Sequence, residues 1–122
     1  MKKKPFNISH RLRSFRYALK GIGHMLYIEH NAWIHTFALI VVVLAGFLFQ
    51  ISKIEWLFIV FAIGFVFTAE AINTAIELLV NKISPEKNEQ AGLIKDVAAG
   101  AVLIAACTAL AIGLIIFLPK IL

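Results

Sequence analysis

Charged residues are scarce in this chain: they make up 16% of its 122 residues, whereas 61% are hydrophobic. Soluble domains typically hold about 25% charged and about 45–50% apolar residues. A globule of this size has too little interior to bury so much apolar surface. The scarcity of charge therefore argues against a soluble protein and indicates a chain that is solvated by lipid.

Cysteine is nearly absent, because Cys107 is the only one. It cannot form an intrachain disulfide, and its apolar surroundings predict a small buried thiol. A cleavable signal peptide is not expected, since MKKK is followed by further basic residues rather than by an apolar core. The net charge of +5 arises mainly beside hydrophobic segments, which favours anionic lipid headgroups over nucleic acid as the partner.

Helical periodicity appears first near the N-terminus. Within residues 6–29, apolar residues recur at spacings of three and four, and Arg13, Arg16 and Lys20 lie on the opposite side. A helix on a soluble core can show the same pattern, but basic residues opposite an apolar stripe are typical of a helix that lies in the membrane interface. We therefore expect an amphipathic surface helix at residues 6–29.

Three apolar runs follow, at residues 34–51, 56–80 and 95–118. Each is long enough, the first one barely, to cross about 30 Å of hydrocarbon as a helix. We expect a tight turn at Ser52–Glu55, and a polar loop at 81–94 in which Pro85 and Gly92 break the helix. The sequence thus predicts an all-α membrane protein, a single domain at residues 1–122 with a surface helix and three transmembrane helices.

The basic residues predict the orientation of these spans. All of the 12 Lys and Arg residues except Lys53 and Lys120 lie in segments 1–33 and 81–95, which three spans place on one side. By the positive-inside rule this side is cytoplasmic. We expect a multi-pass protein of the bacterial cytoplasmic membrane, with its polar residues gathered at the cytoplasmic boundary.

The second span carries the polar residues that most need an explanation. Glu70, Asn73 and Glu77 fall within one arc of about 60° on a helix. An ionisable group in a membrane-spanning segment costs several kcal/mol, as an order of magnitude, unless it has a partner or a function. Glu29, which precedes the first span, is expected to lie near the same boundary. Glu29 and Glu77 together would offer the hard oxygen ligands that suit Mg²⁺ bound to substrate phosphates.

The remaining polar residues suggest what such a magnesium site would serve. Lys95 can neutralise phosphate charge, and the loop residues Glu86, Lys87 and Asn88 can contact a nucleotide. Glu70 is expected deeper, where a lipid hydroxyl can sit and lose its proton to it. Asn73 could orient Glu70 or the transferred group. The pattern favours phosphoryl transfer from magnesium-bound ATP to a membrane alcohol.

Two other functions would place carboxylates in the membrane. A small proton-coupled transporter would need access from both sides, but these groups gather at one boundary. A non-enzymatic membrane assembly protein would use Glu70 and Asn73 for hydrogen bonds between helices. Three of the four histidines, His24, His30 and His35, show no metal-binding spacing and are interpreted as interfacial hydrogen-bonding groups.

A pair of motifs distinguishes these possibilities. EAINTAIELLVN, followed by a short polar loop and KDVAAGAVLIAA, resembles the signature of the small prokaryotic diacylglycerol kinase family, which includes the undecaprenol kinases. The resemblance extends upstream to ALKG and to Glu29 in EHNAWIH, and so covers nearly the whole chain. It implies a homotrimer of three-span subunits with active sites shared between neighbours.

The resemblance also implies roles for individual residues. Glu70 would be the catalytic base, and Glu29 and Glu77 would be the metal ligands. The ATP-binding residues would be Asn73, Lys95 and Asp96 around the phosphates, with Tyr17 and Glu86, Lys87 and Asn88 as nucleotide contacts. Asn81 stands where the family commonly has Asp, and Trp33 where it often has Arg. The choice between diacylglycerol and undecaprenol stays open.

Overall fold

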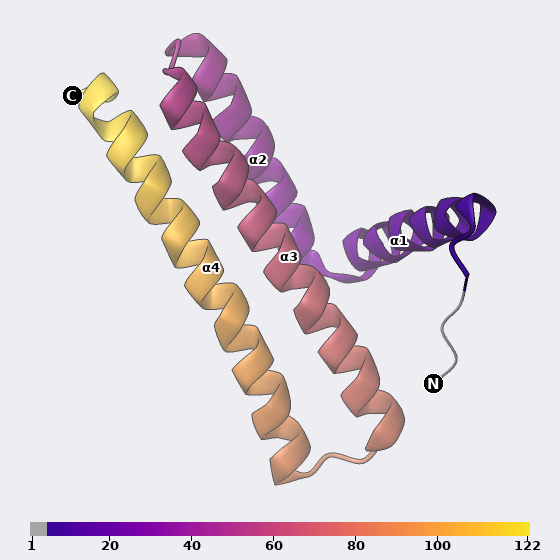
Figure 1. Ribbon diagram of the computed structural model, residues 1–122. Helices are drawn as coiled ribbons and strands as arrows, with labels where there is room; N and C mark the ends of the chain where they lie inside the picture. The colour runs from indigo at the N-terminus through magenta and orange to yellow at the C-terminus, as the bar shows by residue number, and fades with distance from the viewer. Residues whose placement is uncertain (1–4) are drawn as a thin grey trace.

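The computed structural model describes residues 5–122, and all of its secondary structure is helical. The helices are α1 (Ile8–Ile28), α2 (His30–Leu48), α3 (Lys53–Ile83) and α4 (Glu89–Ile121). The last three lie alongside one another as two successive hairpins, while α1 projects away from them (Figure 1). Each of these three is long and apolar enough to cross a membrane. The predicted all-α fold with three membrane-spanning helices is confirmed.

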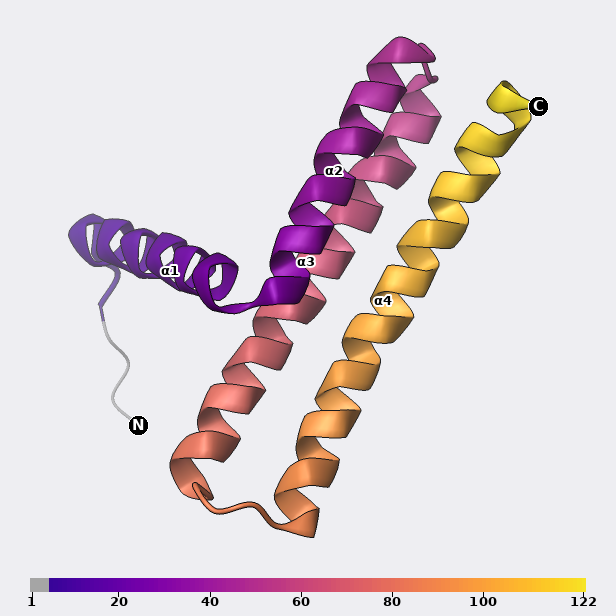
Figure 2. The same ribbon diagram turned by 180° about the vertical axis from the view of Figure 1, so that it is seen from behind.

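Helix α1 begins at a side-chain cap, which accepts a hydrogen bond from a backbone amide that has no carbonyl partner within the helix. Asn7 is the N-cap residue, and its Oδ1 accepts a hydrogen bond from the Ser9 backbone amide at 2.9 Å. The helix ends at Ile28 because Glu29 adopts an extended conformation, with φ −88° and ψ 117°. Seen from behind, α1 again stands clear of the other three helices (Figure 2). Its apolar stripe, Ile8, Leu12, Phe15, Leu19 and Ile22, is exposed on the single chain.

The link between α2 and α3 differs from the prediction. Helix α2 ends at Leu48, and the turn includes Gln50, which has a positive φ of 51°. Ser52 and Glu55 form a capping box, in which each side chain accepts a hydrogen bond from the other residue's backbone amide. The predicted turn at Ser52–Glu55 was therefore wrong, because these residues start helix α3.

The polar loop between α3 and α4 is also shorter than predicted. Asn88 caps α4 by accepting a hydrogen bond from the Ala91 amide at 2.8 Å, so the helix starts at Glu89 rather than at Lys95. Pro85 lies in the non-helical link, as expected, but Gly92 lies inside α4. The prediction that Gly92 breaks the helix was wrong, because the Asn88 cap fixes the start of α4 before that residue is reached.

Helix lengths determine which residues can extend beyond a bilayer. At 1.5 Å per residue, the 19 residues of α2 span about 28 Å, close to one hydrocarbon thickness. The 31 residues of α3 and the 33 of α4 span about 46 Å and about 50 Å. Their joined ends reach past the start of α2, on the side where α1 also leaves the bundle (Figure 1). The N-terminal end of α2 therefore lies beside the middle of α3 rather than beside its C-terminal end.

The opposite end of the bundle holds a cluster of buried apolar side chains. Ile51, Ile59 and Ile116 are buried there, and Trp56 packs against them. Trp56 also covers Gly46, where an added Cβ would lie 2.6 Å from its ring. Most other large apolar side chains are exposed on the single chain, as a lipid-solvated protein requires. Cys107 is among the exposed residues, so the prediction of a buried thiol was wrong for the single chain.

Candidate active site

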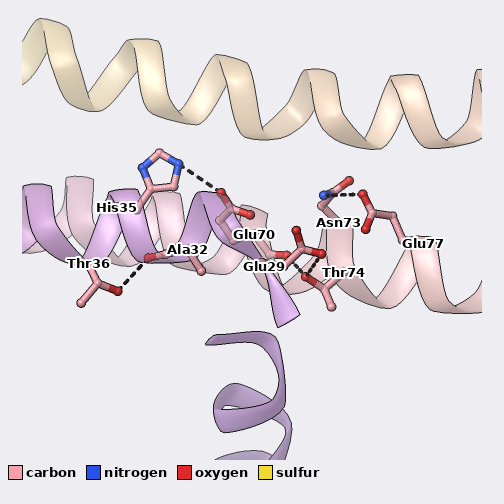
Figure 3. A network of polar contacts seen from close by, with 8 residues as sticks. All are labelled: Glu29, Ala32, His35, Thr36, Glu70, Asn73, Thr74 and Glu77. Atoms are coloured by element: carbon pink, nitrogen blue, oxygen red, sulfur yellow. Dashed lines mark hydrogen bonds and ion pairs between the residues drawn. The ribbon is translucent and has the colours of Figure 1, made fainter. Parts of the chain in front are cut away.

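The most deeply buried polar group of the described residues is the Glu70 carboxyl, on the middle of α3. Its side chain is 0% exposed, and neither of its oxygens accepts a well-aligned hydrogen bond from the residues that the structure describes. The Nε2 atom of His35, on α2, lies 3.0 Å from Glu70 Oε1 (Figure 3). A buried carboxyl without well-aligned hydrogen bonds is expensive to maintain, which makes this position a candidate for function.

One turn further along α3, Thr74 connects the Glu70 helix to Glu29. Its Oγ1 lies 2.9 Å from the Glu70 carbonyl oxygen and 3.3 Å from Glu29 Oε1, and its proton can serve one of them at a time. Glu29 reaches α3 because it sits at the break between α1 and α2, where its side chain caps neither helix. The interruption of the helix at Glu29 therefore places a third carboxyl beside the polar face of α3 that the sequence predicted.

Asn73 and Glu77 complete this face one helical turn apart. The Asn73 Nδ2 donates a hydrogen bond to Glu77 Oε1 at 3.2 Å, while Asn73 Oδ1 is buried without a partner among the described residues (Figure 3). Glu29 lies against the same stretch of α3, through its contact with Thr74. The structure thus places Asn73 and Glu77 in one hydrogen-bonded pair and brings Glu29 to the neighbouring Thr74.

This oxygen-rich cluster fits a hard divalent cation. Two carboxylates close together repel one another unless a cation or a proton lies between them. No group of three or more His, Cys, Asp or Glu side chains suited to a metal occurs in residues 5–122. Mg²⁺, however, is usually held by one or two carboxylates together with phosphates and water. Glu29, Glu77 and the unpartnered Asn73 Oδ1 thus form a donor set suited to Mg²⁺ but not a complete cage.

Apart from this cluster, a polar cleft of about 280 Å³ lies at the end of the α3–α4 hairpin. Lys95 lines it and donates a hydrogen bond from Nζ to Asn81 Oδ1. Asn88 also lines it, but its side chain caps α4 and donates to Ser84 Oγ at 2.6 Å. The other residues that line the cleft are Ser84, Pro85, Glu86, Lys87, Ala91 and Gly92. The loop and the start of α4 thus bring Glu86, Lys87, Asn88 and Lys95 together in one cleft.

Two predicted site residues are not drawn into either cluster. Tyr17 is 68% exposed on α1, which projects away from the other three helices (Figure 2). Asp96 follows Lys95 on α4 and is exposed, outside the residues that line the cleft. One chain by itself therefore assembles Glu29, Glu70, Asn73 and Glu77, and separately the loop cleft with Lys95.

The sequence interpretation missed His35 and Thr74. His35 was treated as an interfacial group, although the structure places its ring against Glu70. A signal was available: His35 lies six residues after Glu29, and Glu70 lies seven residues before Glu77. Because α2 and α3 are antiparallel, residues at similar distances from two neighbouring carboxyls lie at a similar depth. Thr74 carried no comparable signal, since Thr is common in apolar helices.

Comparison with known proteins supports the sequence resemblance. The model of the family described as prokaryotic diacylglycerol kinase matches residues 16–117. The chain is 43% identical over 108 residues to an undecaprenol kinase of Bacillus subtilis, covering 88% of each protein. It is 36% identical over 112 residues to a diacylglycerol kinase of Synechocystis, covering 91% of this chain and 64% of that one. A diacylglycerol kinase of Haemophilus influenzae is 31% identical over 106 residues.

Proposed function

The chain belongs to the prokaryotic diacylglycerol kinase family and is a lipid kinase, and we propose that it phosphorylates the hydroxyl of a membrane lipid alcohol with Mg·ATP. The observation that carries the chemistry is the buried Glu70 carboxyl, beside the Glu29–Asn73–Glu77 cluster. This arrangement supports two roles: Glu70 would act on the lipid hydroxyl, and the neighbouring cluster would bind the metal-bound nucleotide. The transporter and assembly-protein alternatives are not favoured by this family membership.

In the proposed reaction, Glu70 accepts the proton of the lipid hydroxyl as the oxygen attacks the terminal phosphate of ATP. Full burial suits this role, because water does not compete for the carboxylate. Asn73, next to Glu77, orients the phosphoryl group or the base. Glu29 and Glu77 would hold Mg²⁺, which would neutralise phosphate charge during the transfer.

The loop cleft would hold the nucleotide. Lys95 supplies a cation there, and its hydrogen bond to Asn81 keeps the ammonium group near the end of α3. Glu86, Lys87 and Asn88 lie in the same cleft and would contact the nucleotide. Asn81, which replaces the Asp common in the family, accepts this bond as an Asp would, but it adds no negative charge near the phosphates. Asp96 would act with Lys95 at the phosphates.

The proposed assembly is a homotrimer whose active sites are shared. Two observations support an incomplete site in one chain: α1, which carries Tyr17, projects from the bundle, and Tyr17 itself is exposed. A neighbouring subunit can supply Tyr17 or Asp96. The exposed stripe of α1 would lie in the membrane interface, with Arg13, Arg16 and Lys20 at the headgroups.

The proposed membrane is the bacterial cytoplasmic membrane, with the site on its cytoplasmic side. The asymmetry of Lys and Arg supports this orientation, and cytoplasmic ATP requires it. Between the two lipid alcohols, the 43% identity to an undecaprenol kinase supports undecaprenol as the substrate. Diacylglycerol is the second candidate, because two of the relatives are diacylglycerol kinases.

A single assay tests the proposal and the choice of substrate. The purified protein in detergent receives Mg²⁺, labelled ATP, and undecaprenol and diacylglycerol in competition, and the two lipid phosphates are separated. We expect lipid phosphate that depends on Mg²⁺, mostly from undecaprenol. Product from diacylglycerol alone would reverse the assignment of the substrate. No lipid phosphate from either alcohol would refute the proposed reaction.

A further inference from the structure

An apolar groove of about 380 Å³ lies between α2, α3 and α4, and extends from the level of Glu70 toward the turn that joins α2 to α3. Among the described residues that line it, His35 is the only polar one. Val66 and Phe67 line it from α3, one turn from Glu70, and Leu110 and Leu114 line it from α4. The groove therefore has an apolar body and one polar end, which is the shape of a lipid alcohol.

The polar end is formed by two side chains from different helices. His35 Nε2 lies 3.0 Å from Glu70 Oε1, and the His35 side chain is 20% exposed while that of Glu70 is 0% exposed. An imidazole nitrogen and a carboxylate oxygen at this distance repel unless a proton lies between them. When Glu70 is ionised, as a base must be, that proton belongs to His35 Nε2. His35 then carries an N–H 3.0 Å from one oxygen of the base, a close polar contact that falls short of a well-aligned hydrogen bond.

His35 is also the only partner at this distance that the structure gives the Glu70 carboxylate. Thr74 contacts the Glu70 backbone carbonyl rather than its side chain, and Asn73 donates to Glu77. A glutamate side chain has three rotatable bonds, and catalytic groups must be held within about 0.5 Å of their working position. Without His35, no described residue would fix the direction of this carboxylate.

We propose that His35 is a positioning residue for the base: it holds Glu70 Oε1, so that Oε2 receives the hydroxyl of a lipid whose hydrocarbon lies in the groove. The inference rests on the proposed lipid kinase reaction. In that step the hydroxyl oxygen bonds to the terminal phosphorus, the bond from phosphorus to ADP breaks, and the hydroxyl proton passes to Oε2. His35 keeps its own proton throughout and contacts neither phosphate nor metal.

The test compares two substitutions of His35 in the full-length protein in mixed micelles. His35→Gln keeps an N–H donor that can reach Glu70, whereas His35→Leu removes the donor and keeps an apolar side chain of similar bulk. His10→Gln, at the exposed start of α1, is the matched control. For each protein, kcat, the KM for the lipid alcohol, the KM for Mg·ATP and the thermal stability are measured.

We expect His35→Leu to lower kcat on the order of 10- to 100-fold, the usual cost of losing an orienting partner, with the KM for Mg·ATP within about twofold of wild type. His35→Gln should recover most of the loss, and His10→Gln should match wild type. Wild-type kcat in His35→Leu would overturn the proposal, as would equal losses in both His35 variants, which would indicate a packing role. A higher lipid KM with unchanged kcat would make His35 a lipid contact and would also overturn it. Failure of the proposed reaction itself would appear separately, as an inactive wild-type protein.

Discussion

Thr74 Oγ1 lies 3.3 Å from Glu29 Oε1, and this contact ties the break between α1 and α2 to the face of α3 that carries Glu70 and Glu77. The two residues are 45 positions apart in the sequence. The contact brings Glu29 to the helix that carries Glu77, with which it would share the metal. A small hydroxyl therefore links the two halves of the proposed metal site.

Replacing Thr74 with Val should weaken metal-dependent nucleotide binding. Val has nearly the same shape but cannot donate a hydrogen bond, so Glu29 loses a partner that orients it. We expect the KM for Mg·ATP to rise on the order of tenfold, as for other residues that orient a metal ligand. Thr74→Ser keeps the hydroxyl and should stay near wild type. Equal KM values for the Val and Ser variants would show that this contact does not orient Glu29.

Glu70→Gln should abolish turnover without releasing the nucleotide. The carboxamide has nearly the same size but cannot accept the hydroxyl proton, and general-base catalysis is worth about 10²- to 10⁴-fold. Equilibrium binding of Mg·ATP, followed by fluorescence of a nucleotide analogue, should remain within about threefold of wild type. A variant that kept near-native turnover would exclude Glu70 as the base.

Glu77→Gln should have the opposite signature. The loss of one anionic ligand weakens the site for Mg²⁺, so the concentration of Mg²⁺ at half-maximal activity should rise about 10-fold or more. Part of the loss in rate should be recovered at high Mg²⁺. Glu89→Gln, an exposed substitution in the first turn of α4, serves as the matched control and should leave the Mg²⁺ titration unchanged. An unchanged titration in Glu77→Gln would place the metal elsewhere.

Gly46→Ala should destabilise the end of the α2–α3 hairpin at which the two helices are joined. The new Cβ would lie 2.6 Å from Trp56 and 3.2 Å from Ile51, so the Trp56 ring must move out of its packed position. Such overpacking typically costs about 1–3 kcal/mol, which should appear as a lower thermal transition in detergent. Gly23→Ala, where nothing lies within 4 Å of the new Cβ, should be neutral or slightly stabilising. Equal transitions for the two variants would show that Trp56 relaxes freely.

The fold could be predicted closely because each span is specified locally. Long apolar runs without charge predict membrane helices whatever their neighbours, and three such helices are present. The errors fell at the helix ends. Ser52 and Asn88 start α3 and α4 by accepting hydrogen bonds from backbone amides, and these caps extended helices into segments that polarity suggested were loops.

The sequence by itself determined which residues share the polar face of α3. Glu70, Asn73 and Glu77 recur with the helical period, and this period is a property of the backbone alone. Helical geometry therefore gave the face before any packing was known. The motif around these residues likewise indicated the family.

The tertiary structure decided what that face contacts. Glu29 reaches Thr74 because the helix is interrupted between α1 and α2. His35 reaches Glu70 because α2 and α3 pack antiparallel in one particular register. Neither register nor contact between helices follows from a helical period, since sliding one helix along another leaves both patterns unchanged. The spacing from Glu29 puts His35 at a depth similar to that of Glu70, but only the packed helices show that its ring faces the carboxylate.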